Sequence, residues 1–134
     1  MPIMNWDQSL DIGVEAMNAE HREILDLMNK IYDARAAGRD GVIINGLVSQ
    51  LGVCCTKHFA DEERYMAQIG YPELESHKLL HKKLLLTFGE HAAQIKDAGG
   101  KPTDAFFNFL KFWLSSHIKG IDTKYAAHAG AKGR

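Results

Sequence analysis

Four long segments of the chain repeat apolar side chains every three or four residues, and this period most constrains the fold. Such spacing lines up side chains on one face of an α-helix, whereas a half-buried strand alternates at every second residue. Glycines separate the segments, which run over about residues 18–37, 40–69, 72–98 and from 103 to at least 117. Four amphipathic helices joined by short turns predict an all-α, up-down-up-down antiparallel four-helix bundle.

Local residues predict where these helices begin and end. Asn18 and Asp40 are predicted N-caps, because short polar side chains accept hydrogen bonds from free N–H groups at a helix start. Pro72 suits the first helical position, and Gly38 suits the position just past a helix end. We expect a single domain of 134 residues, with an N-terminal arm over about 1–16, the bundle over about 17–122 and a frayed tail over about 123–134.

Charge and hydropathy exclude several classes of function. The net charge is −1 with histidines neutral, so the chain has no excess of positive charge that would attract nucleic acid or an anionic membrane. No run approaches the roughly 18 apolar residues of a membrane span. The start, MPIMNWDQSLDIG, has neither the basic nor the apolar region of a secretory signal. We expect a cytoplasmic protein with no nucleic-acid or membrane partner. We also expect a monomer and name no protein partner.

Ionisable side chains interrupt the helix faces that should be apolar. Burying each one unpaired would cost several kcal/mol. A domain whose total stability is about 5–15 kcal/mol could not carry that cost, so these groups must be compensated. Six of them occupy core-facing positions, namely His21, His58, Glu62, His77, His81 and His117. Asp122 follows five residues after the last of these, at or just beyond the end of the fourth helix.

Counting residues from each turn places these side chains at one level of the bundle. From the first turn, near residue 39, His21 is 18 residues before and His58 is 19 after. From the second turn, near residue 70, His58 is 12 before and His81 is 11 after. Across the third turn His81 and His117 differ by about one helical turn, or about 5 Å. The sequence therefore predicts one polar layer.

Five imidazoles and two carboxylates in one layer predict a metal centre. The pairs His58–Glu62 and His77–His81 have i, i+4 spacing, which puts both members on one helix face. Seven ligands exceed the need of one tetrahedral zinc and suit two ions bridged by carboxylates. Imidazole combined with carboxylate favours iron. With one further bridging oxygen, two six-coordinate ions would keep one open position for a small diatomic ligand.

The sequence resembles the hemerythrin family, and single-domain bacterial members in particular. The likeness covers nearly all of residues 6–125 and rests on a lone histidine followed by HFADEERYM, GYPELESHKLLH and FLKFWLSSHIKGIDTKY. It implies two non-heme irons joined by an oxo or hydroxo bridge, with dioxygen bound reversibly at the iron that has two histidines. The implied roles are His77, His81 and His117 on one iron, His21 and His58 on the other, and Glu62 and Asp122 as bridges.

The resemblance also implies an apolar pocket around the bound dioxygen. The matching positions are Ile24, Phe59, Trp113 and Leu114. Such side chains would pack the core of any bundle, so both interpretations stay open. The sequence departs from the family at one nearby position, where Asn18 stands and the family often has Asp. Either residue can cap a helix.

Dioxygen storage, delivery or scavenging without catalysis is the favoured function, and two alternatives stay open. One is a di-iron enzyme acting on dioxygen, peroxide or nitric oxide, with weak oxidase or peroxidase activity. Di-iron oxidases generally favour carboxylate-rich ligands, and five neutral histidines argue against that. The other is an oxygen or redox sensor that signals to a separate protein.

The remaining cysteines and histidines receive simpler interpretations. Cys54 and Cys55 are adjacent, and neighbouring cysteines rarely form a structural disulfide. Small buried core side chains are favoured over redox-active thiols. His91 and His128 match no ligand position, and we expect both to be solvated.

Overall fold

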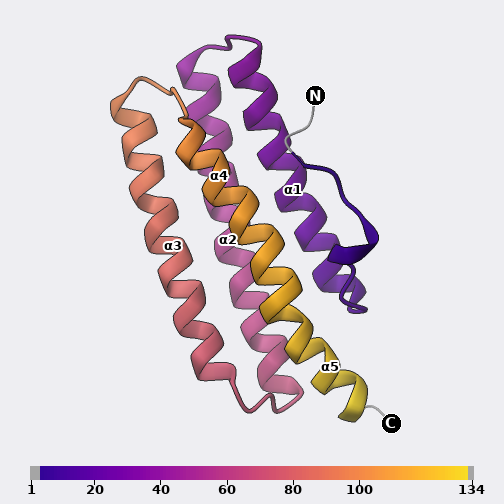
Figure 1. The fold of residues 1–134 in the computed structure, drawn as a ribbon. Coiled ribbons are helices and arrows are strands. Elements are labelled where there is room, and N and C mark those ends of the chain that lie inside the picture. The colour runs from indigo at the N-terminus through magenta and orange to yellow at the C-terminus, as the bar shows by residue number, and fades with distance from the viewer. Residues whose placement is uncertain (1–3, 133–134) are drawn as a thin grey trace.

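Four helical rods lie side by side and alternate in direction (Figure 1). The protein is represented by a computed structural model that describes residues 4–132, and no strand occurs among them. The first three rods are α1 (Glu15–Ala36), α2 (Gly41–Gln68) and α3 (Leu74–Asp97). The fourth is continuous through α4 (Asp104–Phe112), the π-helical segment η2 (Trp113–Asp122) and α5 (Thr123–Lys132). The predicted all-α four-helix bundle is confirmed.

The helix ends follow the local sequence at most turns. The side chain of Asp40 caps α2 by accepting a hydrogen bond from the backbone N–H of Val42 at 2.9 Å. Gly38 follows the C-cap of α1 with φ +65°, a conformation that glycine adopts without steric cost. The N-cap prediction for Asn18 is wrong, because α1 begins at Glu15. Asn18 is buried and accepts from the backbone N–H of Ile12 at 3.1 Å, which holds the N-terminal arm instead.

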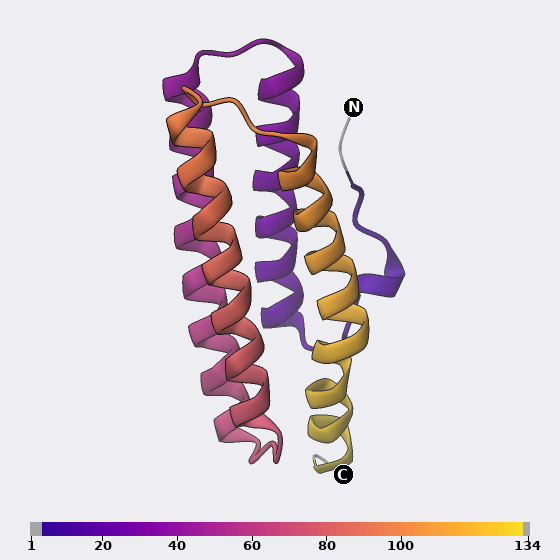
Figure 2. The ribbon, with the colours of Figure 1, turned by 60° about the vertical axis from the view of Figure 1, so that its left-hand side comes forward.

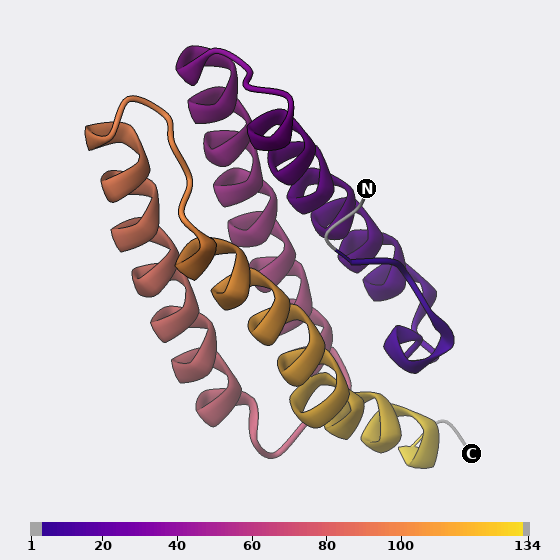
Figure 3. The same ribbon diagram turned by 45° about the horizontal axis from the view of Figure 1, so that its top comes forward.

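Two apolar clusters fill the bundle, one on each side of the predicted polar layer. The larger cluster extends from that layer towards the α1–α2 and α3–α4 turns and includes Ile31, Leu51, Ile95 and Phe106. The smaller cluster lies towards the α2–α3 turn and consists of Met17, Met66, Tyr71 and Tyr125. α2 packs against both α1 and α3 (Figure 3), so its ionisable side chains lie where three rods meet.

The described parts of the N-terminal arm and of the tail make contacts that the sequence did not predict. The arm, which includes the short helix η1 (Gln8–Leu10), lies beside the middle of the fourth rod (Figure 2) and contacts η2. The tail, which we expected to fray, is helical from Thr123 to Lys132 because Tyr125 is buried and anchors it. His128, which we expected to be solvated, is half-buried: its ring packs 5.6 Å from that of Tyr71, and its Nε2 is buried. His91 stacks on Phe109 at 5.2 Å.

Candidate metal centre

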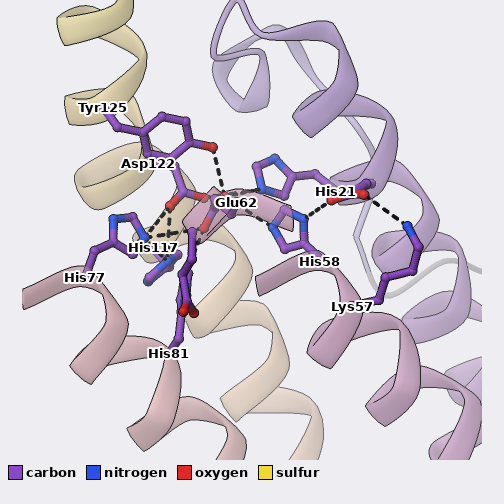
Figure 4. A network of polar contacts seen from close by, with 11 residues as sticks. His21, Lys57, His58, Glu62, His77, His81, His117, Asp122 and Tyr125 are labelled. Atoms are coloured by element: carbon purple, nitrogen blue, oxygen red, sulfur yellow. Dashed lines mark hydrogen bonds and ion pairs between the residues drawn. The ribbon is translucent and has the colours of Figure 1, made fainter. Parts of the chain in front are cut away.

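The structure brings together all seven ionisable side chains that the sequence singled out (Figure 4). Each is at most 8% exposed, although every one of them prefers water. α1 contributes one histidine, α2 a histidine and a glutamate, α3 two histidines, and η2 a histidine and an aspartate. Side chains that lie far apart in sequence thus form one buried polar layer.

The seven side chains divide into two overlapping groups of possible metal ligands. One group is Glu62, His77, His81 and His117, and the other is His21, His58, Glu62 and Asp122. Within each group the candidate ligand atoms all lie within 4.8 Å of one another. Glu62 belongs to both. Asp122 also faces both, with one oxygen 3.2 Å from His21 Nε2 and the other 3.1 Å from His77 Nε2.

A change in helix type brings His117 and Asp122 to the same side. Five residues of an α-helix turn through about 500°, which would point the two side chains in different directions. The segment η2 is π-helical, with i→i+5 hydrogen bonds, and this wider turn aligns positions five apart. Oδ1 of Asp122 lies 3.1 Å from Nε2 of His117. Asp122 is therefore within a continuous helix and not at the helix end that we expected.

The donor atoms of this layer are poorly satisfied by the protein itself. Leaving buried polar atoms unpaired costs about 1–3 kcal/mol each. Metal ions accept lone pairs from imidazole and carboxylate together, so the residues present fit a dinuclear metal centre. Several buried atoms in residues 4–132 make no hydrogen bond of regular geometry, although some of them face one another as ion pairs at 2.8–3.2 Å. They include both ring nitrogens of His21, Nδ1 of His77, Nε2 of His81, one oxygen of Glu62 and both of Asp122.

Electrostatics also favour positive charge at this layer. Burial raises the pKa of Glu62, but hydrogen bonds from histidines outweigh it and hold that pKa well below the usual range. Burial and Glu62 likewise raise the pKa of Asp122, yet histidine hydrogen bonds lower it to about 2. Burial lowers the pKa of His58, while hydrogen bonds to Glu20 and Glu62 raise it to about 10. Two ionised carboxylates thus attract either protons or metal ions, and the two compete.

Three further side chains contact the layer, and sequence reasoning missed them. Glu20 and Glu63 lie 2.7 and 2.9 Å from Nδ1 of His58 and His81 respectively. The hydroxyl of Tyr125 donates to Glu62 at 2.8 Å. Glu20 directly precedes one predicted ligand and Glu63 directly follows another. That adjacency was the available signal, but charged residues beside a core-facing position usually face solvent.

The four side chains predicted to line an oxygen pocket are all buried, at no more than 5% exposure. The ring of Phe59 stacks on that of His81 at 4.0 Å between centroids and meets Trp113 edge-on at 5.7 Å. A cavity of about 10 Å³ lies beside these rings. Phe59 and Trp113 line it, whereas Ile24 and Leu114 do not. The volume is about the least that admits one water molecule.

An antiparallel helical bundle with inward-facing histidines from all four rods and carboxylates from two of them belongs to the class of dinuclear-metal bundle proteins. The family model of the Hemerythrin HHE cation binding domain matches residues 12–129. The chain belongs to the hemerythrin family. It is accordingly a non-heme di-iron protein of a family that binds dioxygen and typically carries it without catalysis.

Individual relatives agree over most of their length. The chain is 34% identical to a myohemerythrin of Riftia pachyptila over 90% of this chain and 88% of the relative. It is 28% identical to a bacteriohemerythrin of Stenotrophomonas maltophilia, over 94% and 81%. A crystal structure of a hemerythrin L114A mutant superposes with a TM-score of 0.86 at 25% identity, covering 96% of this chain and 98% of that one. No helix within residues 4–132 is long and apolar enough to cross a membrane.

Proposed function

We propose that this chain reversibly stores, delivers or scavenges dioxygen at two irons held by the seven buried side chains. His77, His81 and His117 would hold one iron, and His21 and His58 the other. Glu62 and Asp122 would join the two. The observation that carries this proposal is the position of the two carboxylates, each of which lies within 3.6 Å of histidines from both groups.

When bound, the irons supply two one-electron redox centres and an open position for a diatomic ligand. The chain's own residues then decide what else reaches that position. Ile24, Phe59, Trp113 and Leu114 are buried apolar side chains, and Phe59 lies against His81; they would exclude water from that position and slow the arrival of protons. The hydroxyl of Tyr125 donates a hydrogen bond to Glu62 and so fixes the position of the carboxylate that both irons would share.

A carrier without catalytic turnover fits these residues better than an oxidase does. The proposed ligands include five histidines and only two carboxylates, and Glu20 and Glu63 contact histidine nitrogens instead of joining the layer. A smaller anionic charge stabilises highly oxidised iron less. The proposed function involves no nucleic acid, membrane or second subunit.

The test is a visible spectrum of the iron-loaded, dithionite-reduced and desalted protein, recorded under argon, in air and again under argon. A charge-transfer band that appears in air and leaves under argon is expected. The zinc-loaded protein, which has no accessible redox change, is the control and should show no band. A band that decays irreversibly, or dioxygen consumption without a band, would contradict a carrier and favour an oxidase, peroxidase or redox sensor.

A further inference from the structure

Two glutamates outside the proposed ligand set each contact one of its histidines from a neighbouring helix. Glu20 on α1 approaches Nδ1 of His58 on α2 to 2.7 Å. Glu63 on α2 approaches Nδ1 of His81 on α3 to 2.9 Å. In both histidines the other nitrogen, Nε2, faces Glu62 at the centre of the layer, at 3.3 and 2.8 Å. Each glutamate therefore contacts the outer side of an imidazole whose inner side faces the metal centre.

Each of the two ligand groups contains one histidine that a glutamate contacts. His58 belongs to the group with two histidines, and His81 belongs to the group with three. Other histidines lack such a contact, since Nδ1 of His21 and Nδ1 of His77 have no hydrogen-bond partner in residues 4–132. Each proposed iron would thus have one histidine that contacts an outer carboxylate and at least one that does not.

We propose that Glu20 and Glu63 are positioning residues of the di-iron centre, one for each iron, and that their negative charge strengthens two of its imidazole ligands. This inference rests on the proposed ligand set. A carboxylate that accepts the Nδ1 proton fixes the tautomer in which Nε2 is free for metal, and it makes that nitrogen a stronger donor. Stronger donation stabilises the ferric over the ferrous state.

The two glutamates differ in their own surroundings, which makes the inference sharper. The second oxygen of Glu20 lies 3.4 Å from Nζ of Lys57, and that lysine is mostly exposed and also pairs with Asp61. Part of the charge of Glu20 is therefore balanced by an ammonium group. Glu63 contacts His81, and no Lys or Arg pairs with it among the described residues. The charge of Glu63 should consequently act more strongly on its imidazole.

Glu20→Gln and Glu63→Gln test the proposal, because glutamine keeps an acceptor oxygen and the same shape but removes the charge. The measurements are the rate of iron loss to an added chelator and the midpoint potential, both on iron-loaded protein without dioxygen. Iron loss should become about 10–100-fold faster. The midpoint potential should rise, and Glu63→Gln should show the larger shift. A merely structural role would not move the potential of a protein that remains fully loaded.

Glu23→Gln is the matched control. Glu23 lies one turn beyond Glu20 on α1 and lines the same surface depression, so its substitution removes the same charge from the same face. No contact joins it to His58, and the potential and iron loss should stay close to the parent values. Gln variants that match Glu23→Gln in both measurements would overturn the proposal.

Aspartate variants keep the proposal testable if a glutamine variant does not load with iron. Glu20→Asp and Glu63→Asp keep the charge on a shorter side chain, and they should retain more iron than the glutamine variants do. Equal iron loss in both kinds of variant would overturn the role of charge. None of these measurements uses dioxygen, so their failure is separate from failure of the parent protein to bind it reversibly.

Discussion

Different kinds of interaction stabilise the two ends of the bundle. Towards the α1–α2 turn, side chains such as Ile31, Leu51 and Phe106 are buried against one another and contain no polar atoms. Burying each of them contributes about 1.5–3 kcal/mol whether or not anything is bound. At the level of Glu62 and Asp122, the interior consists of ionisable groups, several of whose buried atoms make no hydrogen bond of regular geometry. The apolar end is complete by itself, whereas the polar layer needs bound ions to become stabilising.

This difference teaches that the site and the smaller apolar cluster form one structural unit. The smaller apolar cluster lies beyond the polar layer, and Tyr125 joins the two through its hydrogen bond to Glu62. Any loss of metal should loosen that cluster and the fourth rod before it affects the far end. The following substitutions separate the two ends, in order of expected effect.

Asp122→Ala and His77→Ala should have the largest effect, because each removes one member of a buried charged network. Breaking such a network costs about 3–5 kcal/mol, and here iron content should fall with stability because metal binding is coupled to folding. Iron stoichiometry and thermal unfolding of each variant are the measurements. Backbone amide hydrogens should exchange faster in α5 and in the C-terminal half of α2, and this acceleration should be greater than that near the α1–α2 turn. Unchanged iron stoichiometry in both variants would refute the proposed ligand set.

Gly41→Ala should damage the opposite end and leave the iron in place. A Cβ added at Gly41 would lie 1.9 Å from the backbone oxygen of Gly99, where the α1–α2 and α3–α4 turns meet. Overpacking of this kind costs about 1–3 kcal/mol, or more where backbone cannot move. Gly46→Ala is the matched control, because nothing lies within 4 Å of its added Cβ and alanine favours a helix interior. Loss of iron in Gly41→Ala would show that the two ends are not separable.

The contrast between these ends also explains what could be predicted from the sequence. His58 with Glu62, and His77 with His81, stand at i, i+4, so α-helical geometry alone places each pair on one face. The cap at Asp40 and the turn at Gly38 depend on neighbouring residues, and the sequence predicted both for the same reason. Local physics determines these features.

Features that depend on contacts distant in sequence were not predictable. The π-helical turns that align Asp122 with His117 contradict the spacing of an ordinary helix. Glu20 and Glu63 stand beside core-facing positions, and only the packing of neighbouring helices shows that they reach a histidine. The helical tail likewise depends on Tyr125 meeting Glu62 across 63 residues of sequence.

Tyr125→Phe should test the link between the polar layer and the tail with a smaller effect. The substitution keeps the buried ring and removes only the hydroxyl that donates to Glu62. Leaving a charged acceptor short of one donor costs about 1–3 kcal/mol. We expect the iron to be retained and α5 to exchange its amide hydrogens faster. Tyr65→Phe is the control, because its ring also packs against that of Tyr125 but its hydroxyl makes no hydrogen bond to the layer. Equal exchange in both variants would remove the anchoring role.

The smallest effect concerns the two free cysteines, which stand one turn before His58 at the boundary between the two ends. Burial raises the pKa of Cys54 to about 11, and the nearby Glu23 and Glu20 raise it further in the same direction. Since only the thiolate reacts, alkylation of Cys54 should be slow at pH 7 and should accelerate about tenfold per pH unit up to about pH 10. Mass spectrometry of iodoacetamide-treated protein measures this, with Cys54→Ser reporting the more deeply buried Cys55 alone. Rapid labelling of Cys54 at neutral pH that does not change with pH would instead indicate a reactive thiol. It would also show that solvent reaches the interior beside His58.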